Sequence, residues 1–188
     1  MIQNIFPTKI YATTIDNITE VQQEIGSVID QIPFLRSTRD LGYLNTMFTN
    51  SVDAIMLLKL FKTANTIDRY LKEYCKEIEF EYRQYSVYSW FTKNGRSDQL
   101  QLHHHNDVDI TGTYYFQAEG DCGDFYFESP VGTAPHSFCY SKLHRRHHIV
   151  PETGKLVFFP GWIYHGVLPN DTDKDRISLS FNIIFKRL

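Results

Sequence analysis

The sequence predicts a mainly β protein, a double-stranded β-helix (jelly roll) with N-terminal α-helices packed on the sheet. From about residue 79 onward the chain consists of short aromatic or β-branched segments punctuated by Gly, Pro, Asn and Asp. That pattern is typical of an all-β sandwich or barrel and not of βαβ units. Before residue 79, apolar residues recur at helical spacing. An H-x-D pair at 105–107 and a distal His165 also fit the jelly-roll architecture.

The N-terminal part reads as one strand and two helices. The segment "NIFPTKIYATTI" (4–15) alternates apolar and polar residues, which predicts an opening strand. Apolar residues at helical spacing predict a first helix over 18–32, which Pro33 ends. A second, longer helix follows Asn50 and Ser51 and carries an apolar stripe to Tyr74. We expect both helices to pack on a sheet.

The length of 188 residues fits one domain that can bury its own core. We expect residues 1–188 to form a single domain, with the strand and helices in 1–78 and the catalytic β-core in 79–188. The core segments are "FEYRQYSVYSWFT", "ITGTYYFQA", "GDFYFES", "HHIVP", "KLVFFPG", "HGVLP" and "RISLSFNIIFKRL".

Charge and cysteine content exclude several classes of protein. The net charge of −3 and pI near 6.2 leave no global electrostatic footprint for nucleic acid. The basic run "KLHRRHH" (142–148) is the local exception, and we expect it to be a solvated loop or strand edge. No apolar run approaches a membrane span, and the N-terminus does not resemble a signal peptide. Three cysteines without a CxxC pair favour a reducing compartment, so we expect a cytoplasmic protein. The aromatic-rich helices are compatible with a homodimer.

Potential metal ligands cluster in "QLHHHNDVDITGTYYF" (101–116). In an extended segment, side chains at i, i+2 and i+4 point to one face, so His103, His105 and Asp107 project together and His104 projects away. His165 follows a Phe-Pro-Gly-Trp turn sixty positions beyond His105. Two histidines and one carboxylate on a facial arc, with open positions opposite, form the ligand set of non-haem Fe(II) oxygenases.

A candidate anion site follows in "DRISLSFNIIF". Arg176 lies eleven positions past His165, and Ser178 shares its strand face. A guanidinium presents a planar fork of donors that matches a carboxylate, and an inward-facing Arg is costly unless it meets an anion. A dicarboxylate that chelates the metal at one end and meets Arg176 at the other suggests 2-oxoglutarate. The alternative is an Arg at the rim that pairs with an acidic residue among 171, 173 and 175.

These residues resemble one family. The strings "HHHNDVDITGTYY" (103–115), "GDFYFESP" (123–130), "IVPETGKLVFFPGWIYHGVLPN" (149–170) and "RISLSFN" (176–182) are similar to the 2-oxoglutarate/Fe(II)-dependent oxygenases of bacteria and phages that are related to prolyl hydroxylases. The family pattern runs roughly H-x-H-P-x-S-x-L-S-G-x-Y-Y, then F-P-x-x-x-x-H-x-V, then R-x-S-x-S-F-N. The resemblance covers nearly the whole chain, with Asn106 in place of the Pro and Thr111 in place of the Ser before Gly112.

The resemblance implies a role for each candidate residue. Arg176 would bind the far carboxylate of 2-oxoglutarate with support from Ser178, and Tyr88 or Tyr115 would add a phenolic hydrogen bond. His105 and His165 would bind the metal. Carboxylate chemistry favours Asp107 as the third ligand and the family pattern favours His103, so both remain candidates. Whichever of the two does not bind the metal would support the residues that do.

The implied activity is that of an Fe(II)- and 2-oxoglutarate-dependent dioxygenase, with ascorbate as reductant in an assay. It would hydroxylate a C–H bond of a small molecule or peptide while 2-oxoglutarate is decarboxylated to succinate and CO₂. Two other functions remain open. One is a cupin-like metalloenzyme that uses His103, His105 and His165 without 2-oxoglutarate, and the other is a non-catalytic jelly-roll binding module with a structural metal.

Overall fold

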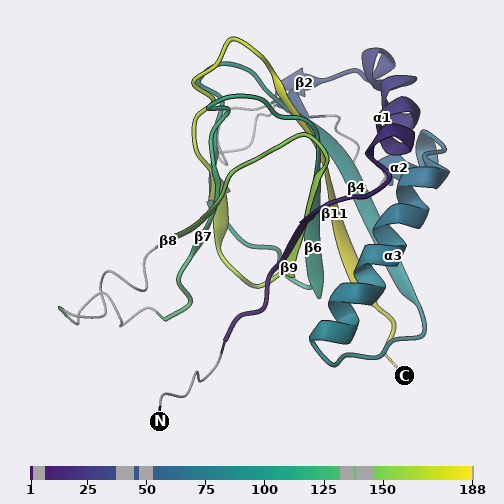
Figure 1. Ribbon diagram of the computed structural model, residues 1–188, viewed down its shortest axis with the longest axis vertical. Coiled ribbons are helices and arrows are strands. Elements are labelled where there is room, and N and C mark those ends of the chain that lie inside the picture. Colours follow the sequence, from purple (N-terminus) through teal and green to yellow (C-terminus); the bar gives the residue numbers. More distant parts are fainter. Residues whose placement is uncertain (2–6, 37–44, 47–52, 132–137, 139–145, 188) are drawn as a thin grey trace.

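The computed structural model describes residues 1, 7–36, 45–46, 53–131, 138 and 146–187. Within these residues the chain forms two antiparallel sheets that face each other (Figure 1). The larger sheet has the order β1-β9-β6-β11-β4-β3-β2, and the smaller has the order β5-β10-β7-β8. The strands are β1 (Tyr11–Thr14), β2 (Leu35–Arg36), β3 (Asn45–Thr46), β4 (Tyr85–Asn94), β5 (Leu100–His103), β6 (Ile110–Gln117), β7 (Phe125–Glu128), β8 (Arg146–Ile149), β9 (Lys155–Pro160), β10 (His165–Val167) and β11 (Arg176–Phe185).

The connectivity of the strands confirms the predicted double-stranded β-helix. The chain passes from β4 in the larger sheet to β5 in the smaller, returns to β6, crosses to β7 and β8, and returns again to β9. It then crosses to β10 and ends in β11, which lies between β4 and β6. Such winding between two sheets is the jelly-roll solution to burying one face of each sheet.

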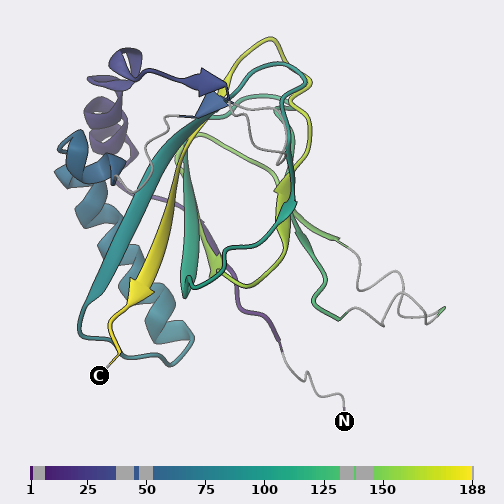
Figure 2. The same ribbon diagram turned by 180° about the vertical axis from the view of Figure 1, so that it is seen from behind.

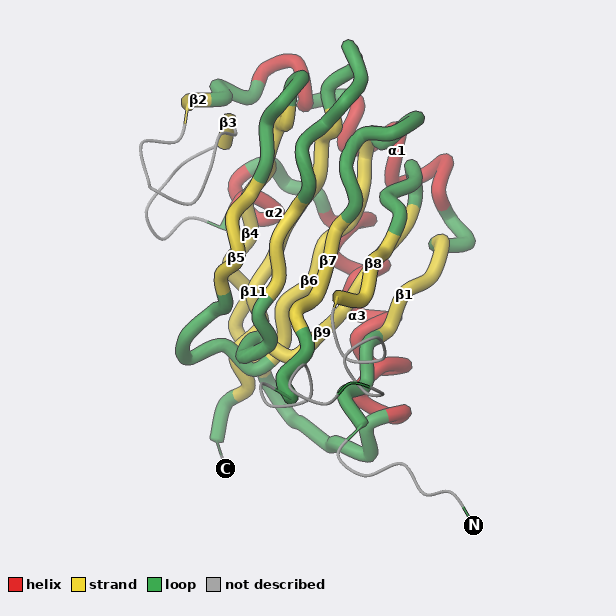
Figure 3. Tube along the Cα trace, turned by 90° about the vertical axis from the view of Figure 1, so that its left-hand side faces the viewer, coloured by secondary structure: helices red, strands yellow, loops and turns green. Residues whose placement is uncertain are grey.

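The helices cover the outer face of the larger sheet, opposite the smaller sheet (Figures 1 and 2). They are α1 (Ile18–Gly26), the 3₁₀ turn η1 (Ile29–Gln31), α2 (Ala54–Leu57) and α3 (Phe61–Glu77). Their apolar faces join buried sheet residues in one core, which includes Ile25, Leu71, Phe158 and Phe181. Viewed onto the sheets, α1 and α3 lie behind the strands (Figure 3).

One carboxylate from α1 fixes the start of α3. The Glu24 side chain accepts hydrogen bonds from the backbone N–H groups of Lys62 and Thr63, at 2.8 and 2.7 Å, and from the Thr63 hydroxyl. These N–H groups have no partner within the helix, and the positive end of the helix dipole favours an anion there.

Both predicted helices are interrupted. The first ends at Gly26 and continues only as the 3₁₀ turn over 29–31. The second is divided because Lys59 adopts a positive φ of 57° between α2 and α3. The Asp53 carboxylate caps α2 by accepting from the Ile55 N–H at 3.1 Å. The predicted start at Asn50 and Ser51 lies outside the described residues.

The N-terminal part also supplies strands to the larger sheet. The predicted opening strand appears as β1, which pairs with β9, whereas residues 2–6 lie outside the described part of the chain. Strands β2 and β3 extend the opposite edge beyond β4. Of the predicted basic run, only Arg146 to His148 are described, and there Arg146 forms an ion pair with Glu128. Among the described helices, none is long and apolar enough to cross a membrane.

Candidate metal and cosubstrate site

A narrow cavity of about 60 Å³ lies between the two sheets. One wall comes from β4, β6, β9 and β11 of the larger sheet, and the other comes from β5, β7 and β10 of the smaller. Alternate residues of β4 and β11 point into it because side chains of a strand alternate between faces. The intervening residues, such as Phe91 and Leu179, point to the helices and join the outer core.

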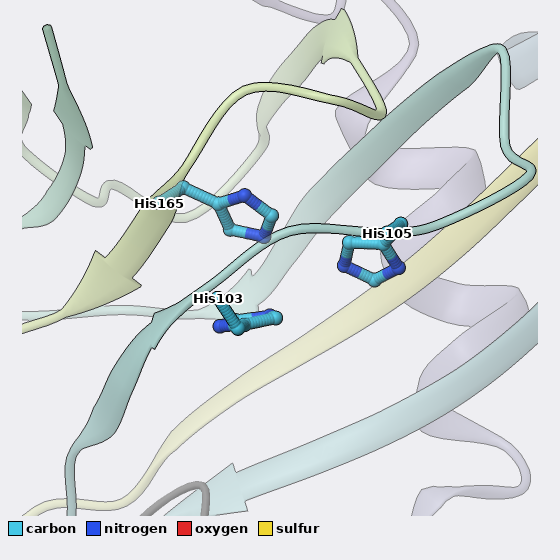
Figure 4. A group of neighbouring side chains, drawn as sticks. All are labelled: His103, His105 and His165. Carbon is cyan, nitrogen blue, oxygen red and sulfur yellow. The ribbon is translucent and has the colours of Figure 1, made fainter. Parts of the chain in front are cut away.

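Three histidines converge at one end of this cavity (Figure 4). His103 ends β5 and His165 begins β10, and the antiparallel register places the two opposite each other. His105 lies just beyond β5, where its backbone N–H donates to the Gly161 carbonyl at 2.9 Å. One ring nitrogen from each histidine lies within 4.8 Å of the other two. That spacing and donor type suit a divalent transition metal.

Hydrogen bonds fix the tautomers of two of these rings. Nδ1 of His103 lies 2.8 Å from the Gln101 carbonyl oxygen, and Nδ1 of His165 lies 2.9 Å from that of Ile163. A carbonyl can only accept, so each Nδ1 carries the proton. The Nε2 lone pair of each ring is then free to bind a cation, as metal-binding histidines require.

Burial keeps the three imidazoles neutral. Burial, with a smaller contribution from the neighbouring histidines, lowers the pKa of His105 to about 4 and that of His165 well below its usual value. Burial also lowers the pKa of His103. The Phe159 ring packs edge-on against His165, with the centroids 4.7 Å apart. Neutral rings are the form that binds metal, because a protonated imidazole has no lone pair to donate.

The structure separates the two candidates for the third ligand. His103 belongs to the cluster, whereas Asp107 is exposed on the turn that follows and has a positive φ of 58°. The alternation that placed them on one face ends with β5 at His103, so it does not carry the Asp107 side chain inward. His104 points elsewhere, as predicted, and packs against the Tyr164 ring with centroids 4.5 Å apart.

Arg176 lies in the same cavity and is 2% exposed. Its Nη1 donates to the backbone carbonyls of Cys122 and Gly123, at 2.9 and 2.6 Å. Two of the three acidic residues that could have paired with it at the rim bind other cations, since Asp173 pairs with Arg96 and Asp175 pairs with Lys93. Burial lowers the pKa of the guanidinium, and no acidic side chain lines the described cavity to offset its charge.

Several hydroxyl groups line the same cavity as this guanidinium. Ser178 lies on the cavity wall, and its Oγ is 2.7 Å from the Thr92 Oγ1. Tyr115 also lines the cavity and is 2% exposed, and burial raises the pKa of its phenol. Tyr88 is 44% exposed and does not contribute to the lining. Of the two predicted tyrosines, the structure brings only Tyr115 to the cavity.

Sequence reasoning missed two cavity residues on β4, Thr92 and Asn94. Trp90, Thr92 and Asn94 all line the cavity, and the Trp90 ring stacks on His105 at 6.1 Å. Their i, i+2, i+4 spacing is the signal that could have identified them. This spacing identifies them only when β4 is known to extend to Asn94 and to pair with β11.

A second, wider pocket of about 870 Å³ adjoins the histidine cluster. His105 contributes to the walls of both spaces, so it lies between the narrow cavity and the wide pocket. Asp107 and the half-exposed Trp162 line the wide pocket, together with the chain on either side of Tyr82 and Phe185. The wide pocket therefore lies next to one of the three clustered histidines.

Solved structures share the fold at low sequence identity. A Pseudomonas putida prolyl-4-hydroxylase matches with a TM-score of 0.68 and 12% identity, covering 95% of this chain and 94% of that one. HygX from Streptomyces hygroscopicus, solved with nickel and 2-oxoglutarate bound, matches with a TM-score of 0.66 and 11% identity over 95% and 84%. A prolyl hydroxylase from Trichoplax adhaerens, solved with a hypoxia inducible factor peptide, matches with a TM-score of 0.66 and 14% identity over 94% and 83%.

Sequence comparison identifies the family. No curated protein matches the sequence. A family model described as "Putative 2OG-Fe(II) oxygenase" matches residues 88–182, about half of the chain. The matched segment contains the three clustered histidines and Arg176. The chain therefore belongs to the 2OG-Fe(II) oxygenase family and is an Fe(II)- and 2-oxoglutarate-dependent oxygenase.

Proposed function

We propose that this oxygenase is a hydroxylase in which His103, His105 and His165 hold Fe(II) and Arg176 binds 2-oxoglutarate. The observation that carries the proposal is a buried guanidinium without an acidic partner among the described lining residues, in the same cavity as three neutral imidazoles. A buried charge is costly unless it is paired, so the cavity is suited to receive an anion. A dicarboxylate cosubstrate supplies one carboxylate for Arg176 and leaves the other end for the metal.

The candidate residues of the cavity divide between metal binding and orientation of the cosubstrate. The Nε2 atoms of His103 and His165 would bind the metal, because their Nδ1 atoms are held by backbone carbonyls. Ser178 orients the carboxylate with its hydroxyl, and the buried Tyr115 phenol adds a donor that Tyr88 is too exposed to supply. Three neutral ligands on one arc leave open positions for the cosubstrate and dioxygen.

When bound, Fe(II), 2-oxoglutarate and dioxygen supply the oxidising chemistry, in which one oxygen atom enters a C–H bond and the other enters succinate, with release of CO₂. The chain orients the cosubstrate and limits access of water. Aromatic rings of Phe125 and Phe159 pack around His165, and Trp90 covers His105. The substrate, a small molecule or a peptide, reaches the site through the wide pocket on the far side of His105.

We assign the enzyme to the cytoplasm on the basis of its thiols. Cys75 and Cys122 are both buried and free, and neither forms a disulfide with a described residue. Free thiols are typical of a reducing compartment. Cys139 lies outside the described residues.

Succinate release from labelled 2-oxoglutarate, in the presence of Fe(II), ascorbate and air, tests the proposal. Wild-type protein should release succinate, and Arg176→Ala should lose that release while it still binds Fe(II) under anaerobic conditions. Arg96→Ala is the matched control, because its ion pair with Asp173 lies on the surface. We expect the control to behave as wild type.

Each contrary outcome has a distinct meaning. Unchanged succinate release by Arg176→Ala would remove this residue from the cosubstrate site. Metal-dependent activity that is indifferent to 2-oxoglutarate would support the cupin-like alternative. Tight metal binding without succinate release would support a binding module. Once a substrate is found, hydroxylation predicts that its product carries one oxygen atom from labelled dioxygen.

A further inference from the structure

A buried amide lies beside the anion-binding guanidinium. Asn94 is the last residue of β4, is 3% exposed and lines the narrow cavity. The register of β4 with β11 pairs Asn94 directly with Arg176. Directly paired residues of adjacent strands project on the same face of the sheet, so both side chains point into the space between the sheets.

The side-chain amide of Asn94 has an unused donor. Its Nδ2 is buried and has no hydrogen-bond partner among the described residues. Nearly all buried polar groups in folded proteins are hydrogen-bonded, and an unsatisfied donor costs free energy. Such an exception within a cavity indicates a group that is satisfied by something that binds there.

The chain holds this amide in place. The backbone carbonyl of Asn94 accepts from Asn170 Nδ2 at 2.9 Å, and Asn170 is itself fully buried. The same Asn170 amide also donates to the Lys174 carbonyl at 2.8 Å. These bonds tie the end of β4 to the loop before β11, so Asn94 and Arg176 keep their relative position.

The cavity therefore has donors in excess near Arg176. Nη1 of Arg176 is used on two backbone carbonyls, whereas its other nitrogens have no acidic partner in the lining. Asn94 adds a further donor without an acceptor. A carboxylate has two acceptor oxygens and can satisfy both residues at once. A neutral amide also adds a hydrogen bond without adding a second buried positive charge.

We propose that Asn94 is a cosubstrate-binding residue, whose Nδ2 donates to the carboxylate of 2-oxoglutarate that Arg176 binds. This rests on the proposed function of the cavity. Asn94 on β4 and Arg176 on β11 donate to the same carboxylate, which fixes the orientation of the carboxylate as well as its position. The binding site then requires an oxo acid with a second carboxylate, and pyruvate, which lacks one, should not replace 2-oxoglutarate.

Binding of 2-oxoglutarate to the protein loaded with Mn(II) in the absence of air tests the proposal. In Asn94→Ala, the dissociation constant for 2-oxoglutarate should rise about 10- to 150-fold, the effect of losing one hydrogen bond to a charged group. The affinity for Mn(II) alone should be unchanged. Asn65→Ala is the matched control, since Asn65 is exposed on α3. It should bind both as wild type does.

A second variant and a thermal measurement distinguish binding from a structural role. Asn94→Asp has the same shape but places a carboxylate beside Arg176, so it should weaken 2-oxoglutarate binding more than Asn94→Ala does. Without 2-oxoglutarate, Asn94→Ala should melt no earlier than wild type because an unsatisfied donor has been removed. With saturating 2-oxoglutarate, wild type should gain more thermal stability than the variant.

Wild-type affinity for 2-oxoglutarate in Asn94→Ala would overturn this assignment, and so would an equal loss of melting temperature with and without 2-oxoglutarate. Either result would leave the proposed function standing, provided that wild type still releases succinate. Absence of 2-oxoglutarate binding by the wild type itself would defeat both proposals.

Discussion

Gly112→Ala should destabilise the protein because there is no space for a methyl group at this position. Gly112 lies in the middle of β6 with the Phe181 ring directly against its Cα. A Cβ built there would lie closer than 3.0 Å to two atoms of that ring and 2.9 Å from the Val157 carbonyl oxygen. Neither group can withdraw easily. Phe181 is fully buried against Phe158, and Val157 belongs to β9, which is paired with β6.

The size of the effect follows from two opposing terms. An extra methyl group in a well-packed core costs about 1–3 kcal/mol. Replacing Gly by Ala returns about 0.4–1 kcal/mol, because the unfolded chain loses conformational freedom. We therefore expect a net loss of about 1–2 kcal/mol in the free energy of unfolding. In a chain of this size that loss corresponds to a fall of about 2–8 °C in melting temperature.

Urea denaturation, followed by tryptophan fluorescence, measures this loss, and Gly26→Ala provides the control. Gly26 ends α1, and a Cβ there would meet its nearest neighbour, Phe116 Cζ, at 4.0 Å. The same substitution should therefore stabilise the protein slightly at Gly26 while destabilising it at Gly112. Phe181→Leu should partly relieve the clash, so it should cost less in the Gly112→Ala background than in wild type.

Equal stability of Gly112→Ala and Gly26→Ala would refute this reasoning. It would mean that β6 and β11 can separate enough to admit a methyl group at no measurable cost. Fully additive effects of Gly112→Ala and Phe181→Leu would refute the claim that the Phe181 ring is the obstacle.

Three further predictions concern the site and its surroundings. In a titration with Co(II), a spectroscopic substitute for Fe(II), Asp107→Asn should bind the metal as tightly as wild type. His103→Asn should bind it at least about 100-fold more weakly. Equal losses of affinity in the two variants would place Asp107 among the ligands. Adding 2-oxoglutarate should tighten Co(II) binding, because a dianion offsets the charge that the cation brings into a cavity without acidic side chains; unchanged affinity would contradict this coupling. Burial raises the pKa of the Cys75 thiol to about 11. Mass-spectrometric mapping at pH 8 should therefore show slow alkylation of Cys75 in the folded protein and fast alkylation in urea. Equal alkylation rates in the two conditions would contradict the burial of Cys75.

The sequence predicts the fold well because its signals are local and repeated. Each β-core segment that was predicted from aromatic and β-branched residues corresponds to a strand, namely β4 or one of β6 to β11, whereas β5 was not among these segments. Helix boundaries were less accurate. The apolar spacing continues through Lys59, where the backbone turns to a positive φ, and side-chain periodicity contains no information about that turn.

The choice of the third histidine required three-dimensional information. Strand alternation predicts that His103, His105 and Asp107 share one face, and the structure brings only the two histidines together. The strand ends at His103. Beyond it, the backbone N–H of His105 donates to the Gly161 carbonyl, and the side chains no longer alternate as they do in a strand. Asn94 could not be singled out from the sequence either, because an Asn next to a Gly reads as a turn residue. Its role follows from its pairing with Arg176, a partner 82 positions away.

The charges of the cavity explain why the metal and the cosubstrate belong together. A ligand set with one carboxylate cancels part of the charge of Fe(II), whereas His103, His105 and His165 are neutral and cancel none of it. Arg176 adds a positive charge in the same buried space, and the lining offers no acidic side chain. A cation alone would therefore enter an unfavourable electrostatic field, which is stronger in a protein interior than in water. A dicarboxylate relieves this repulsion, since one end meets the metal and the other meets Arg176. If the three histidines are the ligands, the lack of an acidic side chain among the described lining residues would link retention of the metal to the presence of the cosubstrate, and the proposed hydrogen bond from Asn94 would give that cosubstrate a defined orientation.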